Sequence, residues 1–432
     1  MPALPADAAA ASARGPATAI AFALEAARRA MQHGAAPDAA LGMLFVRALA
    51  ALIGAALRPA GGDPAYQALV LRTRDAEVDE HVWLAEQAEA DRRTVLAGVD
   101  AIAHPGKLRS VAPGPQRDAL AELHRLASAG AWAALRAAAA QLIAQPSADG
   151  KLHATLGLLL QQPALARLER GTALHSLPAV ARYRSLCALS GPAAGSEAAH
   201  AKGTAAAQRG HRAEAGAMQA LQRIAETLQR RAPAAARYRV AGNLLVPAGF
   251  PGSASKAKNE WDAALLRTAD AGADAPAEIA LLVEVKASPE AAVSDVARLV
   301  AGLQRLAHAQ AEASYAFASA DGPVRLLDAS LRALRPVGEA LPPQVIYCCS
   351  APAEPQVPML SAASRGVLLS ERASLAFAAA LAAGEAPDPQ RLGPVWQELG
   401  SAARLRGVLH QYDTARTVRE AMLHPDDLLA AL

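Results

Sequence analysis

Cysteine and aromatic residues are scarce in this chain of 432 residues. Its only cysteines, Cys187, Cys348 and Cys349, have no CxxC spacing, so the sequence predicts neither a zinc site nor a disulfide framework. Free thiols without such a framework are typical of a reducing compartment, and we expect a cytoplasmic protein. Aromatic residues make up 3% of the chain, whereas apolar residues reach 53% and include many alanines, which favour closely packed helices.

The chain also lacks a large net charge and several familiar motifs. Its formal charge of +3 is too small for a general affinity for nucleic acid, so any basic surface must be local. The absence of GxxxxGK[ST], GxGxxG and GxSxG patterns leaves NTPase, dinucleotide-binding and α/β-hydrolase functions without support. The N-terminus carries Asp7 and no early Lys or Arg, unlike a secretory signal. The apolar window 40–57 contains Arg47 and predicts a core helix, so we expect no membrane association.

Two regions with different patterns follow one another along the sequence. Residues 1–195 place apolar residues at three- and four-residue spacing, with Pro and Gly between the segments, which predicts an all-helical region. The stretch GPAAGS at 191–196 marks the expected boundary. We expect residues 196–432 to form a second domain, of the α/β class, because strand patterns appear there for the first time.

The second region predicts helices and strands in an ordered series. Residues 202–231 have the pattern of a long amphipathic helix, and a helix from Ser294 to Gln310 is expected later. The predicted strands are residues 237–247, 261–269, 278–287, 314–319, 344–350 and 366–370. A turn at 270–277 joins the second strand to the third, and another helix follows the last strand. The order is α-β-β-β-α-β with additions, which indicates a layered domain with a mixed sheet.

Two charged residues interrupt the apolar strand LLVEVKA. Glu284 and Lys286 are two residues apart and therefore lie on one face of a strand. If the preceding strand pairs with this one, Asp262 can lie across from them. Two carboxylates are hard oxygen ligands suited to Mg²⁺ or Mn²⁺. A lysine beside them could orient a water molecule or stabilise charge on a phosphate group.

These residues resemble the motif of the PD-(D/E)XK nuclease superfamily. NEWDAALL and LLVEVKAS are similar to its "EhDhh" and "hhEhK" strands, where h is an apolar residue. The superfamily often places a glutamate after a glycine on its first helix, and Gly210 and Glu214 have that spacing. Some members add a glutamine on the helix after the lysine, as Gln304 does here. The likeness covers residues 200–350 and departs in having tryptophan, not proline, before the aspartate.

The resemblance implies a restriction-endonuclease-like fold and metal-dependent hydrolysis of nucleic-acid phosphodiesters. Asp262, Glu284 and the backbone carbonyl of Val285 would bind Mg²⁺ or Mn²⁺. Lys286 would assist the attacking water, Glu214 would be a helper ligand or would orient water, and Gln304 would be a lesser pocket residue. The expected partner is nucleic acid, with DNA as the first expectation, and the helical region would recognise a protein partner or target.

Local charge agrees with a phosphate-bearing partner. Between Lys202 and Arg267 the chain has eleven Lys or Arg and four Asp or Glu. A basic surface around an acidic pocket suits a nucleic-acid backbone. Solvated helix charges, such as Arg223, Arg230 and Arg231, would give the same excess without any ligand.

Other interpretations of the pattern remain open. Glu284 and Lys286 could pair with each other on the solvated face of an edge strand, or the fold could be an inactive nuclease used as an interaction module. Glu77 and His81, with Glu86 and Glu89, could contribute to a metal site in a helix bundle, but a solvated helix face explains their spacing far better. The strings AIAHPGKL and KAKNEWDAA also resemble bacterial chains labelled 3-deoxy-D-arabino-heptulosonate 7-phosphate synthase, which implies a (β/α)₈ barrel. The helical first 190 residues disfavour a barrel, because they show no β-α alternation.

Overall fold

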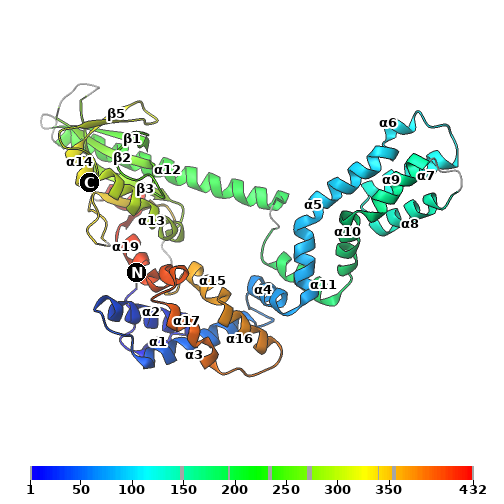
Figure 1. The fold of residues 1–432 in the computed structure, drawn as a ribbon. Coiled ribbons are helices and arrows are strands. Elements are labelled where there is room, and N and C mark those ends of the chain that lie inside the picture. Colours follow the sequence, from blue (N-terminus) through cyan, green and yellow to red (C-terminus); the bar gives the residue numbers. More distant parts are fainter. Residues whose placement is uncertain are drawn as a thin grey trace. The chain divides into compact units, whose positions relative to one another are not determined.

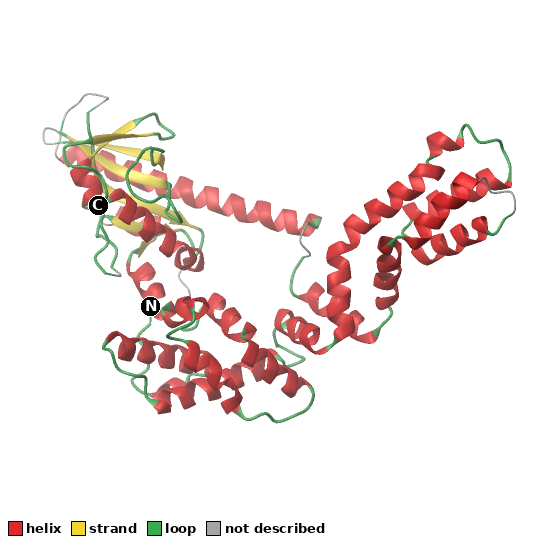
Figure 2. Cartoon of the chain, in the orientation of Figure 1, coloured by secondary structure: helices red, strands yellow, loops and turns green. Residues whose placement is uncertain are grey.

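The computed structural model describes residues 2–145, 150–192, 195–231, 236–269, 275–338, 340–352 and 357–430. The chain divides into two compact units (Figures 1 and 2). The first, called here the sheet unit, comprises residues 1–53, 194–374 and 387–432. The second, the helical unit, comprises residues 54–193 and 375–386. The sequence led us to expect a single domain boundary near residue 195. In the structure, the first 53 residues belong to the same compact unit as most of the C-terminal half.

The sheet unit contains a mixed five-stranded sheet, so its fold is α/β. The strand order is β1-β2-β3-β6-β7, where β1–β2–β3 are antiparallel and β6 and β7 continue in parallel. The strands are β1 (Arg237–Leu245), β2 (Glu260–Thr268), β3 (Glu278–Lys286), β6 (Val345–Cys349) and β7 (Met422–Leu423). A separate hairpin joins β4 (Ser314–Phe317) to β5 (Val324–Leu327). Residues 270–274 of the expected turn between β2 and β3 lie outside the described residues.

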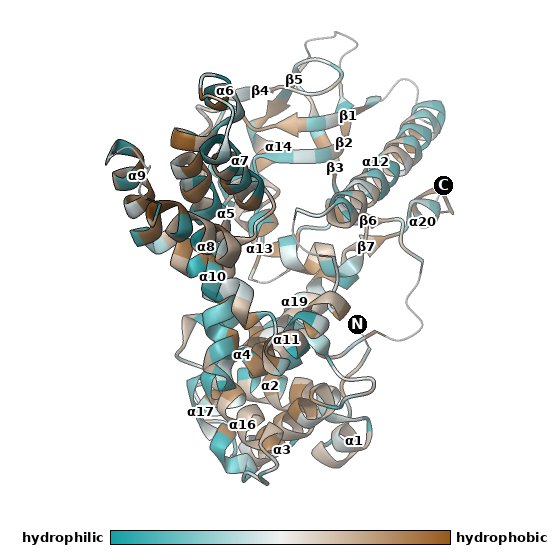
Figure 3. Cartoon of the chain, turned by 90° about the vertical axis from the view of Figure 1, so that its right-hand side faces the viewer, coloured by the Kyte–Doolittle hydropathy of each residue, from teal (hydrophilic) through white to brown (hydrophobic). Residues whose placement is uncertain are grey.

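Helices cover both faces of this sheet. On one face, apolar side chains of α12 (Glu197–Arg231) and α20 (Pro425–Ala430) pack against alternate residues of β2, β3 and β6. On the other face, α13 (Pro289–Leu306), α14 (Asp328–Arg332) and α19 (Gln411–Glu420) pack against the remaining alternate residues. The two faces therefore belong to different apolar clusters, as the period of two in a strand requires. Figure 3 shows hydrophilic residues along α12, whose first turns are almost entirely exposed.

The ends of the chain meet within the sheet unit. A buried ion-pair cluster joins α2 (Pro16–Gln32) to α19: Arg28 contacts Glu25 at 2.7 Å and lies 3.8 Å from Asp413. The Tyr412 hydroxyl donates a hydrogen bond to the Pro2 carbonyl. The N- and C-terminal helices of this unit are α1 (Ala8–Ala13), α2 (Pro16–Gln32), α3 (Ala39–Ala56), α15 (Ala362–Ser370), α17 (Gly393–Glu398) and α18 (Arg406–Leu409), with 3₁₀ turns at Pro389–Leu392 and Ala403–Leu405.

One expected strand is wrong. Residues 366–370 belong to α15, which begins after Ser361, whose side chain accepts a hydrogen bond from the Ser364 N–H. Ser364 and Leu368 are both buried, four residues apart on one helix face. A five-residue apolar run does not distinguish a strand from one side of a short helix, and the N-cap decides the matter here.

The regular elements described in the helical unit are helices, packed around two apolar clusters. They are α4 (Pro64–Arg74), α5 (Ala76–Ala103), α6 (Pro105–Leu108), α7 (Pro115–Ser128), α8 (Trp132–Ile143), α9 (Gly150–Gln161), α10 (Pro163–Leu174), α11 (Pro178–Leu189) and, from Leu375 onward, α16 (Arg372–Ala382). In the sheet unit, α3 has the length and apolar composition of a membrane span, and Phe45, Leu49 and Ile53 on it are buried within the protein.

Candidate active site

Asp262 lies where β2 and β3 separate. The antiparallel ladder between the two strands ends with Ala263 opposite Val283. Beyond this pair, Asp262 Oδ2 accepts a hydrogen bond of 2.7 Å from the backbone N–H of Val285. The carboxylate therefore satisfies a strand N–H in place of a backbone carbonyl of β2. This bond fixes the Asp262 side chain at the open end of the strand pair, where it keeps 22% exposure.

Glu284 is a fully buried carboxylate held by two lysines. Val283 and Val285 belong to the apolar cluster under α12, so Glu284 and Lys286 point to the opposite face, toward α13. Oε1 of Glu284 lies 2.6 Å from Lys258 Nζ and 2.7 Å from Lys286 Nζ. A buried charge requires such pairing. Glu284 therefore does not lie on the solvated face of an edge strand, which was the alternative explanation of its pairing with Lys286.

Lys286 has a second acidic partner on α13. Its Nζ lies 3.3 Å from Asp295 Oδ2, and Arg298 lies 3.7 Å from the other oxygen of Asp295. Burial alone would lower the pKa of Lys286, but its hydrogen bond to Glu284 and the negative charges of Glu284 and Asp295 outweigh burial and raise that pKa. Lys286 is therefore held as an ammonium ion in the site.

Lys258, which the motif does not include, completes this cluster. It precedes β2, and its backbone N–H donates a hydrogen bond of 3.1 Å to the Arg298 carbonyl on α13. The backbone also packs closely on Gly302, where an added Cβ would lie 2.9 Å from Lys258 Cβ. From this fixed backbone, Nζ reaches Glu284 and lies 3.9 Å from Asp262 Oδ1. One ammonium group thus stands between the two carboxylates.

Two buried polar atoms beside this cluster lack hydrogen bonds. Among the described residues, neither Glu284 Oε2 nor the Tyr347 hydroxyl has a partner. Tyr347 lies opposite Glu284 in the register of β3 and β6. Burial raises the pKa of Tyr347, and the negative charges of Asp295 and Glu284 raise it further. The described protein atoms therefore leave hydrogen-bonding capacity unused on Glu284 and Tyr347.

The pKa of Glu284 is raised to about 7. Burial is the largest cause, the charge of Asp262 is the second, and the contacts with Lys258 and Lys286 offset both in part. The charge of Asp262 acts on Glu284 because Oδ1 of Asp262 and Oε1 of Glu284 lie 3.9 Å and 2.6 Å from the same nitrogen, Lys258 Nζ. Glu284 therefore gains and loses its proton near neutral pH.

Asp262 and Glu284 are donors of the kind that a hard divalent ion takes. No three His, Cys, Asp or Glu side chains gather as a metal site anywhere in the described part of the chain. Mg²⁺, however, is commonly bound by one or two carboxylates together with waters and phosphate oxygens. Asp262 and Glu284 provide two carboxylates, and Oε2 of Glu284 has no other partner. The space between them holds the Lys258 ammonium, so the residues fit a metal ion once this side chain moves aside.

The structure does not bring Glu214 and Gln304 to this cluster. Glu214 is exposed on α12. Ala213 and Ala217, which are close to it on this helix, pack against the face of the sheet opposite to the one that carries Glu284 and Lys286. Gln304 is exposed on α13, between the buried residues Leu303 and Arg305. Asp262, Glu284, Lys286 and the backbone of Val285 are therefore the expected site residues that come together, and Lys258, Asp295 and Tyr347 join them.

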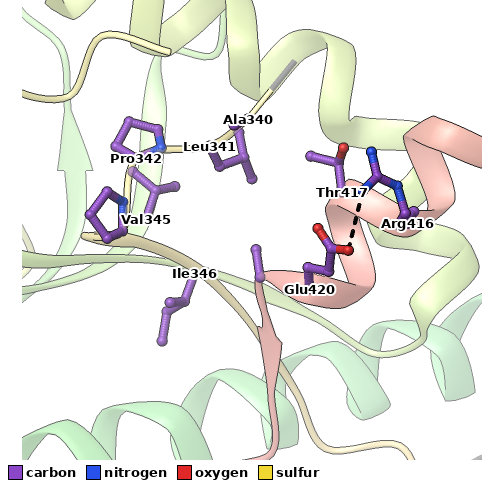
Figure 4. Close-up of a pocket in the computed structure, with 10 residues that line it drawn as sticks. Ala340, Leu341, Pro342, Val345, Ile346, Arg416, Thr417 and Glu420 are labelled. Atoms are coloured by element: carbon purple, nitrogen blue, oxygen red, sulfur yellow. Dashed lines mark ion pairs between the residues drawn. The ribbon is translucent and has the colours of Figure 1, made fainter. Parts of the chain in front are cut away.

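Other cavities lie apart from this cluster. Figure 4 shows a cavity of about 310 Å³ between the segment before β6 and the end of α19. Its arginine, Arg416, already pairs with Asp413 at 2.6 Å and with Glu420 at 3.5 Å, which leaves little positive charge for an anion. A cavity of about 510 Å³ between α13, α15 and α19 is lined mostly by apolar side chains. In the helical unit, burial lowers the pKa of His81, whose ring packs 5.2 Å from that of His175.

Comparisons with protein-family models, with curated proteins and with solved structures gave no match for this chain.

Proposed function

We propose that the sheet unit hydrolyses phosphodiester bonds of nucleic acid with the aid of Mg²⁺ or Mn²⁺, at a site of the restriction-endonuclease type. The observation that carries this proposal is the meeting of Asp262, Glu284 and Lys286 where β2 and β3 separate. The elements α12-β1-β2-β3-α13 follow one another in the chain, and β6 comes after the inserted β4, β5 and α14 and pairs with β3, which supports the proposal. The fold around the site therefore agrees with the chemistry of its residues.

Each residue has a distinct part in the proposed reaction. Asp262, Glu284 and the backbone carbonyl of Val285 would hold the divalent ion. When bound, the ion would polarise the phosphate and lower the pKa of a water molecule, so that the water can attack phosphorus. Lys286 would stabilise the negative charge that builds up on the phosphate oxygens, because Glu284 and Asp295 keep it charged.

Basic side chains provide a second, weaker support. Lys258 is engaged with Glu284, so the local excess of positive charge at the surface is smaller than the sequence indicates. The arginines of α12 are exposed: Arg209, Arg212, Arg223, Arg230 and Arg231. These side chains could contact phosphates outside the pocket. Glu214 and Gln304 have no part in this proposal, because both are exposed on their helices.

A specific observation favours one alternative. Lys258 and Lys286 both contact Glu284, so the carboxylates are compensated by charges of the chain itself. A site that is satisfied in this way could belong to a nuclease fold that serves as an interaction module. The barrel expected for a heptulosonate-phosphate synthase is not favoured, because the described strands form one five-stranded sheet and a hairpin.

A cleavage assay distinguishes the two functions. End-labelled single-stranded, duplex and branched DNA and RNA are incubated with the protein in Mg²⁺, Mn²⁺ or EDTA. We expect cleavage only with a divalent ion, no cleavage by Asp262→Ala, and undiminished cleavage by Glu260→Ala, which removes an exposed carboxylate two residues away. Protein that binds the ion but cuts none of these substrates would support the interaction module instead.

A further inference from the structure

The geometry points to Lys258 as an internal cation that occupies the position of the divalent ion, so that a metal can bind only by displacing its side chain. This inference rests on the proposed function, because it concerns the same two carboxylates. It assigns a role to a residue outside the motif, and it explains why the charges of Asp262 and Glu284 are compensated by the protein alone.

The contacts of Lys258 are those of a bridging cation. Its Nζ lies 2.6 Å from Glu284 Oε1 and 3.9 Å from Asp262 Oδ1, and its side chain is only 10% exposed. A divalent ion shared by these carboxylates would need the same space, because metal–oxygen distances of about 2.0–2.6 Å place it between the two oxygens. The ammonium group and the ion therefore compete for one position.

The backbone of Lys258 is held in place by its neighbours, whereas its flexible side chain can change rotamer. The backbone is fixed by the hydrogen bond to the Arg298 carbonyl and by close packing on Gly302. A lysine stem has four rotatable bonds, so the ammonium can swing away while the loop stays in place. Displacement then requires a change of side-chain rotamer and no rearrangement of α13 or β2.

Charge balance explains why the ion cannot simply join the cluster. The acids are Asp262, Glu284 and Asp295, and Lys258 and Lys286 oppose them, with Arg298 beside Asp295. A divalent ion added beside Lys258 would place three cations on one buried carboxylate. Like charges at such distances repel strongly where water is excluded. Replacement of Lys258 by the ion avoids this repulsion.

Direct binding of Mn²⁺ tests the inference without any nucleic acid. The full-length protein is freed of metal and titrated with Mn²⁺, and the free ion is followed by electron paramagnetic resonance. We expect Lys258→Met to bind Mn²⁺ about 10- to 100-fold more tightly than the wild type, the factor that corresponds to a charge-assisted hydrogen bond. Lys256→Met, which removes an exposed lysine of the same loop, should bind as the wild type does.

Lys286→Met is the matched control for charge alone. Lys286 contacts the same oxygen of Glu284 at nearly the same distance but does not stand between Glu284 and Asp262. It should therefore tighten Mn²⁺ binding less than Lys258→Met does. Equal tightening by both variants would show an effect of charge and not of position, and would overturn the inference.

Thermal melting provides a second readout. Without metal, Lys258→Met should melt at a lower temperature than the wild type, because Glu284 loses a buried partner, and Mn²⁺ should restore most of the loss. Lys258→Gln, which keeps a polar group, serves if the methionine variant does not fold.

The outcomes of these titrations separate the inference from the proposed function. Unchanged affinity for Mn²⁺ in the Lys258 variants would overturn the inference and leave the proposed function intact. Absence of Mn²⁺ binding in the wild type and in every variant would remove both. Tight binding that survives in Asp262→Asn/Lys258→Met would place the ion elsewhere and also overturn the inference.

Discussion

Replacement of Glu284 by glutamine should remove a pH dependence of stability that burial of this carboxyl confers on the sheet unit. Glutamine has nearly the same shape but does not titrate. The wild-type carboxyl is fully buried, and its pKa is raised from 4.5 to about 7 by burial and by the charge of Asp262. The variant therefore isolates the contribution of one proton to folding.

The sign of the effect follows from proton linkage. Between pH 4.5 and 7 the folded protein holds the Glu284 proton while the unfolded chain has released it. Stability therefore falls as the pH rises through this window and levels off above it. Each unit of difference in pKa corresponds to about 1.4 kcal/mol, so the wild type should lose about 3 kcal/mol relative to Glu284→Gln across the window.

Hydrogen exchange of β3 amides measures this free energy in the sheet unit alone. Exchange is compared between wild type and Glu284→Gln at each pH, with a chelator present, so that the intrinsic exchange rate cancels. The opening free energy of the wild type minus that of Glu284→Gln should fall steadily from pH 4.5 to 7. A difference that stays constant, or a wild type that gains stability with pH, would show that the lysines hold Glu284 ionised and would refute the reasoning.

Two substitutions test the packing that supports the site. Gly302→Ala should lower the stability of the sheet unit by about 1–3 kcal/mol in thermal melts, because the new Cβ would lie 2.9 Å from Lys258 Cβ. Gly216→Ala is the control: a new Cβ on this residue of α12 would enter open space, so the variant should be as stable as the wild type or more stable. Glu25→Ala should cost about 3–5 kcal/mol in denaturant titrations, because it removes the closest acidic partner of the buried Arg28; a cost below 1 kcal/mol would show that this cluster is dispensable.

The sequence predicted the strands of the site well because their signals are local. Alternation and β-branched residues placed β1, β2 and β3 within two residues of their observed ends. The same period of two placed Glu284 and Lys286 on one face, and the pairing of β2 with β3 brings Asp262 to them. These conclusions needed only the strand geometry and the order of elements.

Contacts between distant segments could not be predicted in this way. Lys258 and Asp295 lie on a loop and on a helix, where nothing in the local pattern distinguishes them from solvated charges. Their role depends on how closely the loop packs against Gly302 of α13. The packing of the first 53 residues in the same unit as α19 also depends on tertiary contacts, such as the ion pair between Arg28 and Asp413. The sequences of α2 and α19 show only ordinary amphipathic patterns, which do not indicate this contact.

The most direct test of the central claim measures metal binding and cleavage in the same sample of Lys286→Ala. If Asp262 and Glu284 hold the ion and Lys286 stabilises the phosphate charge, this variant should still bind Mn²⁺ but cut about 10²- to 10³-fold more slowly than the wild type under single-turnover conditions. Asp262→Ala should lose both binding and cleavage. A Lys286→Ala protein that cuts at the wild-type rate, or an Asp262→Ala protein that keeps metal-dependent cleavage, would contradict the assignment of this site.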